Sequence, residues 1–327
     1  MSTVIAFDPG YGNTKICIDQ QTTVLQSVVV RPRSVGLAAT GMKSAAQITQ
    51  VQIGDRLFGV GSGAWHWGEV YSNLDYTALA SLERRALFYA GYSQLMQPGE
   101  FNFDMLVIGL PVPLLQNEQE AQRVMNNLKN YKGVHDFEVN QQFYRVTIDH
   151  VKAMAQPAGA YANWLLDSEL RSRKSARQCE VAVLDIGMNT ADLYVVQDGR
   201  VEPRYIGGGK LGVRRLFNLL SDDGHDMQEL DMELQSGRLR LPEKGLESWM
   251  EEIMGLVERT WPSLKRFSAV IPAGGGSAIL GDMLRVTLAS KGAALYWPEN
   301  PVTANVLGLW KYTTARILRE ASHASNS

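Results

Sequence analysis

The fold class of this chain is decided by one stretch of its sequence, VAVLDIGMNTADLYVV at residues 181–196. The apolar residues of Val181–Leu184 predict a buried strand, and Leu193–Val196 predict a second strand that ends at the turn dipeptide Asp198-Gly199. Between the two strands lies a loop that begins with Asp185. The stretch therefore predicts a β-hairpin that carries a carboxylate at the end of its first strand.

The same plan occurs near the N-terminus, in VIAFDPGYGNTKICI at residues 4–18. Asp8 ends the first apolar run there as Asp185 does in the later stretch, and the two residues are 177 positions apart (185 − 8), about half of the 327-residue chain. This spacing predicts two homologous halves that face one another.

The rest of the chain mixes helical and strand patterns. Helical spacing or Pro at a first helical turn predicts helices over Thr77–Gln97, Glu118–Tyr131, from Pro157 onward, and over Val213–Leu220, Met227–Leu234, Leu246–Trp261 and Thr303–Glu320. Continuous apolar or alternating runs predict strands over Asp104–Leu110, Phe143–Val151 and Ala269–Ile271. Such a mixture is typical of an α/β layer fold.

Composition and charge narrow the class of protein. The chain is 45% apolar and 20% charged, as ordinary globular proteins are, and its length predicts about two domains. Its net charge is 32 − 34 = −2, so we expect no direct DNA binding. The chain has only two cysteines, which suits a reducing compartment, and its first apolar run is too short for a signal-peptide core, so we expect a cytoplasmic protein. No apolar run is long enough to predict a membrane span.

Both hairpin loops have the composition of a phosphate-binding site. Glycine lets backbone N–H groups approach phosphate oxygens, and Asn and Thr side chains add donors. Asp8 and Asp185 can then anchor Mg²⁺ on a nucleoside triphosphate, and Lys15 adds positive charge near its phosphates. One such loop alone is more often a plain turn, but two in matching positions favour a nucleotide. The predicted binding residues are Asp8, Gly10, Gly12, Asn13, Thr14 and Lys15 in the first loop and Gly187, Asn189, Thr190 and Asp192 in the second.

Two further glycine clusters extend the predicted nucleotide site. One is Gly207, Gly208, Gly209 and Lys210, shortly after the second hairpin; the other is Gly274, Gly275, Gly276 and Ser277, between a buried strand and a helix. The second cluster would let the backbone lie flat against a nucleobase or sugar, with a helix N-terminus near the phosphates; a simple flexible loop is the alternative. The P-loop motif does not occur in the chain, and the dinucleotide-binding fingerprint is absent at the first strand, where Gly10-Tyr11-Gly12 is followed by Asn13-Thr14-Lys15.

Five segments in this order resemble the motifs of the actin-like ATPases, in the superfamily of actin, Hsp70 and the sugar kinases. They are phosphate 1 (Phe7–Lys15), a first connecting helix (Ala155–Ala160), phosphate 2 (Leu184–Asp192), an adenosine motif (Pro272–Ser277) and a second connecting segment (Asn300–Leu309). Within the superfamily the chain is most similar to the ParM/StbA plasmid-segregation proteins and to archaeal actin-like proteins.

The resemblance implies a fold, a cofactor and residue roles. The fold would be the duplicated actin-like (ribonuclease H-like) α/β fold, with domains at 1–160 and 161–327, a small subdomain near 30–75 and a C-terminal helix that packs back on the first domain. A cleft between the domains would hold ATP or GTP with Mg²⁺, with Asp8 and Asp185 as metal anchors. Water would attack the γ-phosphate, with Gln156 orienting it and Asp185 as the candidate base, because Gln cannot accept a proton.

The function that the resemblance implies is nucleotide-dependent polymerisation, for plasmid or DNA segregation or a bacterial cytoskeletal role. The partners would be further copies of the chain and a small DNA-binding adaptor protein. Two alternatives stay open on the sequence: a small-molecule kinase of the same superfamily, and a non-hydrolysing scaffold that uses nucleotide to set domain closure.

Overall fold

The computed structural model describes residues 4–31, 48–71, 78–220 and 227–324. The chain divides into two compact units. Unit 1 comprises Met1–Ile108 and Glu118–Lys152, and unit 2 comprises Gly109–Asn117 and Ala153–Ser327. The division at residue 160 and the subdomain near residues 30–75 stay predictions.

Unit 1 is organised by a nine-stranded sheet of order β3-β2-β1-β7-β9-β8-β5-β6-β4. The strands are β1 (Val4–Pro9), β2 (Asn13–Ile18), β3 (Gln21–Gln26), β4 (Val29–Val30), β5 (Thr49–Ile53), β6 (Arg56–Val60), β7 (Gly99–Leu110), β8 (Gly133–Val139) and β9 (Gln142–Ala155). Its helices are α1 (Leu82–Ser93) and α3 (Glu118–Leu128), with short 3₁₀ turns at Ser62–His66 and Lys129–Tyr131. β1 pairs antiparallel with β2 and parallel with β7.

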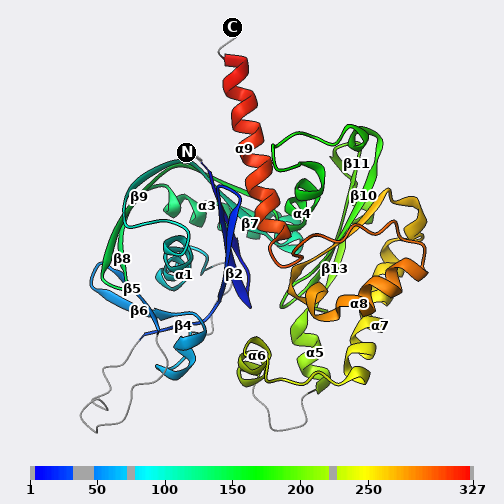
Figure 1. Cartoon of the computed structure of the whole chain (residues 1–327), viewed down its shortest axis with the longest axis horizontal. Helices are drawn as coiled ribbons and strands as arrows, with labels where there is room; N and C mark the ends of the chain where they lie inside the picture. Colours follow the sequence, from blue (N-terminus) through cyan, green and yellow to red (C-terminus); the bar gives the residue numbers. More distant parts are fainter. Residues whose placement is uncertain (1–3, 32–47, 72–77, 221–226, 325–327) are drawn as a thin grey trace. The chain divides into compact units, whose positions relative to one another are not determined.

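Aromatic side chains form much of the unit 1 core around α1, which lies within the curve of β9, β8 and β5 (Figure 1). Phe7 of β1 packs on Phe88 of α1 with ring centroids 5.1 Å apart. Tyr89 of α1 stacks on Phe137 of β8 at 4.0 Å. Offset and edge-to-face aromatic pairs add to the stabilisation that burial alone gives, so α1 joins β1 to β8, which lies three places further along the sheet.

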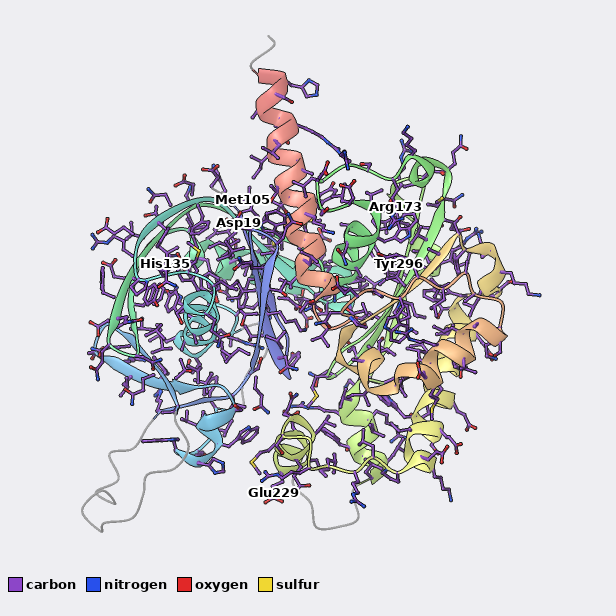
Figure 2. The ribbon with its side chains drawn as sticks, in the orientation of Figure 1. Asp19, Met105, His135, Arg173, Glu229 and Tyr296 are labelled. Atoms are coloured by element: carbon purple, nitrogen blue, oxygen red, sulfur yellow. The ribbon has the colours of Figure 1, made fainter. Side chains whose placement is uncertain are left out.

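His135 is the one histidine of the described core, and both of its ring nitrogens are bonded. Its Nε2 lies 2.8 Å from the Tyr131 carbonyl oxygen and therefore donates, and its Nδ1 accepts from the Tyr89 hydroxyl at 2.9 Å. Figure 2 shows the side chain inside unit 1, near α1. Burial lowers the pKa of His135, although the Tyr131 carbonyl acts in the opposite direction. The folded state therefore holds this imidazole neutral.

Unit 2 repeats the central arrangement of unit 1. Its sheet has the order β12-β11-β10-β14, with β13 also paired to β11. The strands are β10 (Glu180–Ile186), β11 (Ala191–Gln197), β12 (Arg200–Val201), β13 (Gly207–Gly209) and β14 (Ala269–Ala273). β10 pairs antiparallel with β11 and parallel with β14, as β1 does with β2 and β7. Both predicted hairpins are thus confirmed, and each occupies the same place in its sheet.

Helices cover both faces of the unit 2 sheet. They are α2 (Val112–Gln116), α4 (Gln156–Leu165), α5 (Val213–Leu220), α6 (Met227–Gln235), α7 (Glu243–Thr260), α8 (Gly274–Ser290) and α9 (Ala304–Ala324). Leu184 and Leu193 face a cluster that includes Trp249 of α7 and Leu284 of α8. The alternate residues, such as Val183 and Tyr194, face a cluster with α4 and α9. Burial of both faces explains why the strands are apolar along their whole length.

Helices α4 and α9 cross with their backbones almost in contact. A Cβ atom at Gly308 of α9 would lie 1.7 Å from the carbonyl oxygen of Gly159 in α4. A Cβ at Gly159 would in turn lie 2.1 Å from the carbonyl oxygen of Asn305. Neither position accepts a larger residue without a shift of one helix against the other.

The predicted elements are confirmed with shifted ends. The helix predicted from Thr77 begins at Leu82, after the capping residue Ser81, and the region that includes Thr77 lies outside the described residues. The strand predicted over Asp104–Leu110 begins at Gly99, since outward-facing polar residues hid its first half. Among the described residues, no helix is long and apolar enough to cross a membrane.

We predict that Gly308→Ala lowers the free energy of unfolding by about 1–3 kcal/mol, the cost typical of overpacked core substitutions. The added Cβ atom would force α9 away from α4. The measurement is the free energy of unfolding in urea. Gly255→Ala in α7 is the matched control: its Cβ meets only the end of the Arg259 side chain, at 3.4 Å. This control should be neutral or stabilising, because Ala has the higher helix propensity. Equal effects of the two variants would contradict the assigned crossing.

A second prediction concerns pH. Because the pKa of His135 is lower in the folded than in the unfolded chain, its contribution to stability is present above the unfolded value of about 6.5 and is lost as pH falls toward the folded pKa. This loss has a slope of up to about 1.4 kcal/mol per pH unit. Unfolding followed between pH 7.5 and 5 should show a shallower acid slope in His135→Gln. The exposed-site control His66→Gln should keep the wild-type slope.

Candidate functional site

Asp8 occupies the end of β1 in unit 1 and is only 1% exposed. Its backbone register places it opposite Lys15 of β2, whose Nζ lies 3.1 Å from the Asp8 Oδ2 atom. A carboxylate so deeply buried needs a cationic or hydrogen-bonded partner, and Lys15 supplies one. The structure therefore brings together two of the predicted binding residues.

The loop after Asp8 is held by hydroxyl groups. Ser27 donates to the Gly10 carbonyl oxygen at 2.8 Å, and its Oγ atom lies 3.0 Å from that of Thr14. Thr14 itself is buried, whereas Asn13 is half-buried. A Cβ at Gly10 would come within 2.5 Å of the Asn13 carbonyl oxygen, so the loop closes tightly on itself. Ser27 was not among the sequence-predicted residues.

Arg84 of α1 is the second group behind this loop that the sequence pattern missed. It is fully buried, and its Nη1 atom lies 3.2 Å from the carbonyl oxygens of both Pro9 and Gly10. Arg84 thereby satisfies two carbonyl groups of the loop. A neighbouring cation of this kind also raises the electrostatic potential at the loop.

The corresponding loop of unit 2 begins at Asp185, which is 6% exposed. The loop closes through a hydrogen bond from the Gly187 amide to the Thr190 carbonyl, 2.8 Å. Its carbonyls then accept from the start of α5: Val213 N donates to Gly187 O at 3.0 Å, and Arg214 N to Met188 O at 2.9 Å. Both Asn189 and Thr190 are partly exposed.

The glycine triplet at 274–276 is the first turn of α8 and not a loop. Gly274 has φ +84°, and a Cβ there would lie 2.6 Å from Asp185 Oδ1 and 2.3 Å from the Ile186 carbonyl oxygen. Gly276 packs on the Ile186 side chain, where a Cβ would approach to 2.2 Å. The triplet thus lets the N-terminus of α8 lie directly against Asp185. Ser277 is buried and donates to the Ala273 carbonyl at 2.6 Å.

Asp192 lies opposite Asp185 in the β10–β11 register, at the place that Lys15 occupies opposite Asp8. Burial, reinforced by the Asp185 carboxylate, raises the pKa of Asp192 to about 8. Thr190 donates to its Oδ2 atom at 3.4 Å, and the Val112 amide also bonds to the carboxyl. The two hairpins therefore have the same backbone pairing. The residue opposite the strand-end aspartate is a lysine in unit 1 and a second aspartate in unit 2.

The cluster Gly207–Gly209 forms β13, which pairs with β11. Gly208 lies opposite Asp192, and a Cβ there would lie 2.8 Å from Asp192 Oδ1. Lys210 follows the strand and is exposed. The structure therefore places the cluster beside the second loop, as a strand.

Gln156 is the first residue of α4 and is 9% exposed. Pro157 follows it in the first turn, where the helix needs no amide donor. Asp185 accepts a hydrogen bond from Asn305 of α9, whose Nδ2 lies 2.7 Å from Asp185 Oδ2. Asn305 lies in the second connecting segment but was not predicted as a site residue.

Besides the hydroxyls of Thr313 and Thr314 in α9, which can donate as well as accept, three buried oxygens of unit 2 have no hydrogen-bond partner among the described residues. They are Asn189 Oδ1, Asp192 Oδ1 and Asn305 Oδ1. Buried polar atoms are normally satisfied by protein, water or a ligand. The two amide oxygens can only accept, so the group that satisfies them must carry protons to donate, whereas Asp192, whose pKa is raised to about 8, has a proton of its own at neutral pH.

Unit 2 also has a cavity of about 160 Å³, next to the C-terminal end of α4 and the C-terminal half of α9. It is lined by Leu165 at the end of α4 and by Tyr312, Arg316 and Arg319 of α9, among others. None of the sequence-predicted site residues lines it.

Comparison with known proteins identifies the fold. Residues 6–159 match the family model described as the actin-like proteins N-terminal domain. No curated protein matches the chain in sequence.

Solved structures match over nearly the whole chain. The actin-like protein Alp7A aligns with a TM-score of 0.74 and 16% identity, covering 99% of this chain and 98% of its own. A 15-stranded ParM filament from Clostridium botulinum gives 0.71 and 19%, covering 95% and 99%. Ta0583, an archaeal actin homolog, in complex with ADP, gives 0.68 and 21%, covering 97% and 100%.

We predict that Arg84→Met loosens the loop at residues 9–14 and costs about 1.5–3 kcal/mol of stability, because two carbonyls lose a charged donor. Hydrogen exchange of peptides that span the loop should rise, and the urea midpoint should fall. The neighbouring Arg85→Met is the matched control, since Arg85 donates to the Asn130 carbonyl and not to the loop. Unchanged exchange at residues 9–14 in Arg84→Met would contradict the role given to Arg84.

Proposed function

This chain carries an actin-like protein N-terminal domain at residues 6–159 and has the actin-like fold over nearly its whole length, and we propose that it is a filament-forming ATPase. The observation that carries the proposal is the repeated strand-end aspartate. Asp8 and Asp185 each end the first strand of a hairpin, each is buried, and each begins a glycine-containing loop. We propose that these are nucleotide-binding loops, with ATP as the ligand and GTP as the alternative.

The residues of unit 2 fit a hydrated Mg²⁺ ion. Mg²⁺ keeps several of its waters and is held by few carboxylates together with phosphates. Asp185 supplies a carboxylate, and the amide oxygens of Asn189 and Asn305 are suited to protons of metal-bound water. Asp8 is the proposed anchor in unit 1. When bound, Mg²⁺ would neutralise charge on the phosphates during transfer.

The proposed reaction transfers the γ-phosphoryl group of ATP to water. A bond forms from the water oxygen to phosphorus, the bond to the ADP oxygen breaks, and one water proton passes to a base. Gln156 would orient the water through its amide, and Asp185 is our candidate base, because a carboxylate accepts a proton and an amide does not. Glycine loops and the N-terminus of α8 would supply N–H donors to phosphate oxygens.

Polymerisation is the second part of the proposal. Identical subunits that associate head to tail form open filaments when the rotation between them does not close. One of the structures with the same fold is that of a ParM filament. We propose that this chain assembles likewise in a nucleotide-dependent way in the cytoplasm, for plasmid or DNA segregation or a bacterial cytoskeletal role, with a small DNA-binding adaptor protein as partner.

The test combines phosphate release with sedimentation in Mg·ATP. We predict that wild type sediments with Mg·ATP and not without nucleotide, and that Asp185→Asn lowers phosphate release at least about 100-fold, the minimum typical of a lost acid–base group. Asp198→Asn is the matched control, because Asp198 is exposed and lies at the other end of the same hairpin with φ +51°, a conformation that Asn adopts readily.

The outcomes separate the competing functions. Turnover that needs an added sugar or other hydroxyl compound would indicate a kinase. Filaments that form with ATP while Asp185→Asn changes neither phosphate release nor assembly would indicate a non-hydrolysing scaffold. A protein that neither binds ATP nor sediments under any of these conditions would overturn the proposal.

A further inference from the structure

Asn305 is the side chain that holds Asp185 in place. It is the second residue of α9, is 3% exposed, and donates from Nδ2 to Asp185 Oδ2 at 2.7 Å. The amide orientation is fixed by chemistry: the reversed amide would place an oxygen against the carboxylate oxygen, which no hydrogen bond could offset.

The backbone around Asn305 is fixed as well. Its carbonyl oxygen lies where Gly159 of α4 leaves room for it, and the Gly274 amide at the start of α8 donates to the Pro301 carbonyl just before α9, at 2.9 Å. Three helices, α4, α8 and α9, therefore determine where the amide lies. A donor held in this way orients its acceptor without further loss of side-chain entropy on binding.

The side-chain oxygen of Asn305 indicates that a ligand binds beside it. Asn305 Oδ1 is buried and receives no hydrogen bond from the residues that the structure describes. Asn189 Oδ1 shares this condition, and Asn189 belongs to the loop that Asp185 begins. A group of buried acceptors without donors is costly unless a proton donor joins them, and water bound to a cation is such a donor.

We infer that Asn305 is a positioning residue for Mg²⁺: its Nδ2 sets the orientation of Asp185, and its Oδ1 accepts a proton from a metal-bound water. The inference rests on the proposed nucleotide binding and goes beyond it, since it assigns a role to a residue outside the phosphate loops. Outer-sphere partners of this kind typically contribute 10- to 100-fold to metal affinity.

The test measures ADP affinity by calorimetry with Mg²⁺ and with EDTA, so that no turnover is needed. We predict that wild type binds ADP at least tenfold more tightly with Mg²⁺. In Asn305→Ala the affinity in EDTA should stay at the wild-type value, while the gain from Mg²⁺ falls about 10- to 100-fold. Asn305→Leu keeps a similar volume and removes both the donor and the acceptor without adding charge, so it should lose the same gain, and it carries the test if the alanine variant does not fold.

Asn163→Ala is the matched control. Asn163 Oδ1 accepts from Lys311 Nζ at 2.9 Å, so this variant also removes a hydrogen bond between α4 and α9, away from Asp185. It should lower the melting temperature and leave the gain from Mg²⁺ unchanged.

Two results would overturn the inference, and they differ in what they say of the proposed function. If wild type and both Asn305 variants show the same gain from Mg²⁺, Asn305 has only a structural role and nucleotide binding stands. If wild type binds ADP neither with Mg²⁺ nor in EDTA, the proposed function and the inference fail together.

Discussion

The close crossing of α4 and α9 is the constraint on which the candidate site of unit 2 depends. With glycine at positions 159 and 308, the two backbones come within the distance that a single Cβ atom would fill. Asn305 lies one turn before Gly308, so the same crossing sets the position of its amide relative to Asp185. Packing of helices is therefore what orients a carboxylate on a strand of the sheet beneath them. The precision required of such a site is reached more readily on helices and strands than on loops.

The two hairpins show how one backbone plan supports two electrostatic environments. In both units an aspartate ends the first strand and faces a residue of the second strand across the register. That residue is Lys15 in unit 1, which compensates the charge of Asp8 directly. In unit 2 it is Asp192, whose pKa is raised by burial and by Asp185, so its proton replaces the missing cation. Unit 1 thus pairs its strand-end aspartate with a cation, whereas unit 2 pairs it with a protonated carboxyl group.

The sequence predicted the parts of the fold that local patterns determine. Both hairpins were predicted correctly because an apolar run, an aspartate and a turn dipeptide follow one another without interruption. The beginning of β7 and the strands β5, β6 and β8 were missed, since their exposed or alternating residues resemble loops. The triplet at 207–209 looks like a loop from composition alone, but its pairing with β11 makes it a strand. Long-range pairing overrides the local preference of glycine in that case.

The residues of the candidate site were likewise predictable only where a local sequence pattern determines them. The aspartates and glycines of the loops are recognisable by their order along the chain. Arg84 was not, because nothing in the pair Arg84-Arg85 tells which guanidinium enters the core and reaches a loop some 75 residues away in sequence. Asn305 was visible within a motif, but its role depends on a contact across 120 residues. Side chains that support a site from behind are selected by three-dimensional packing, so they become evident only when the elements that carry them are placed together.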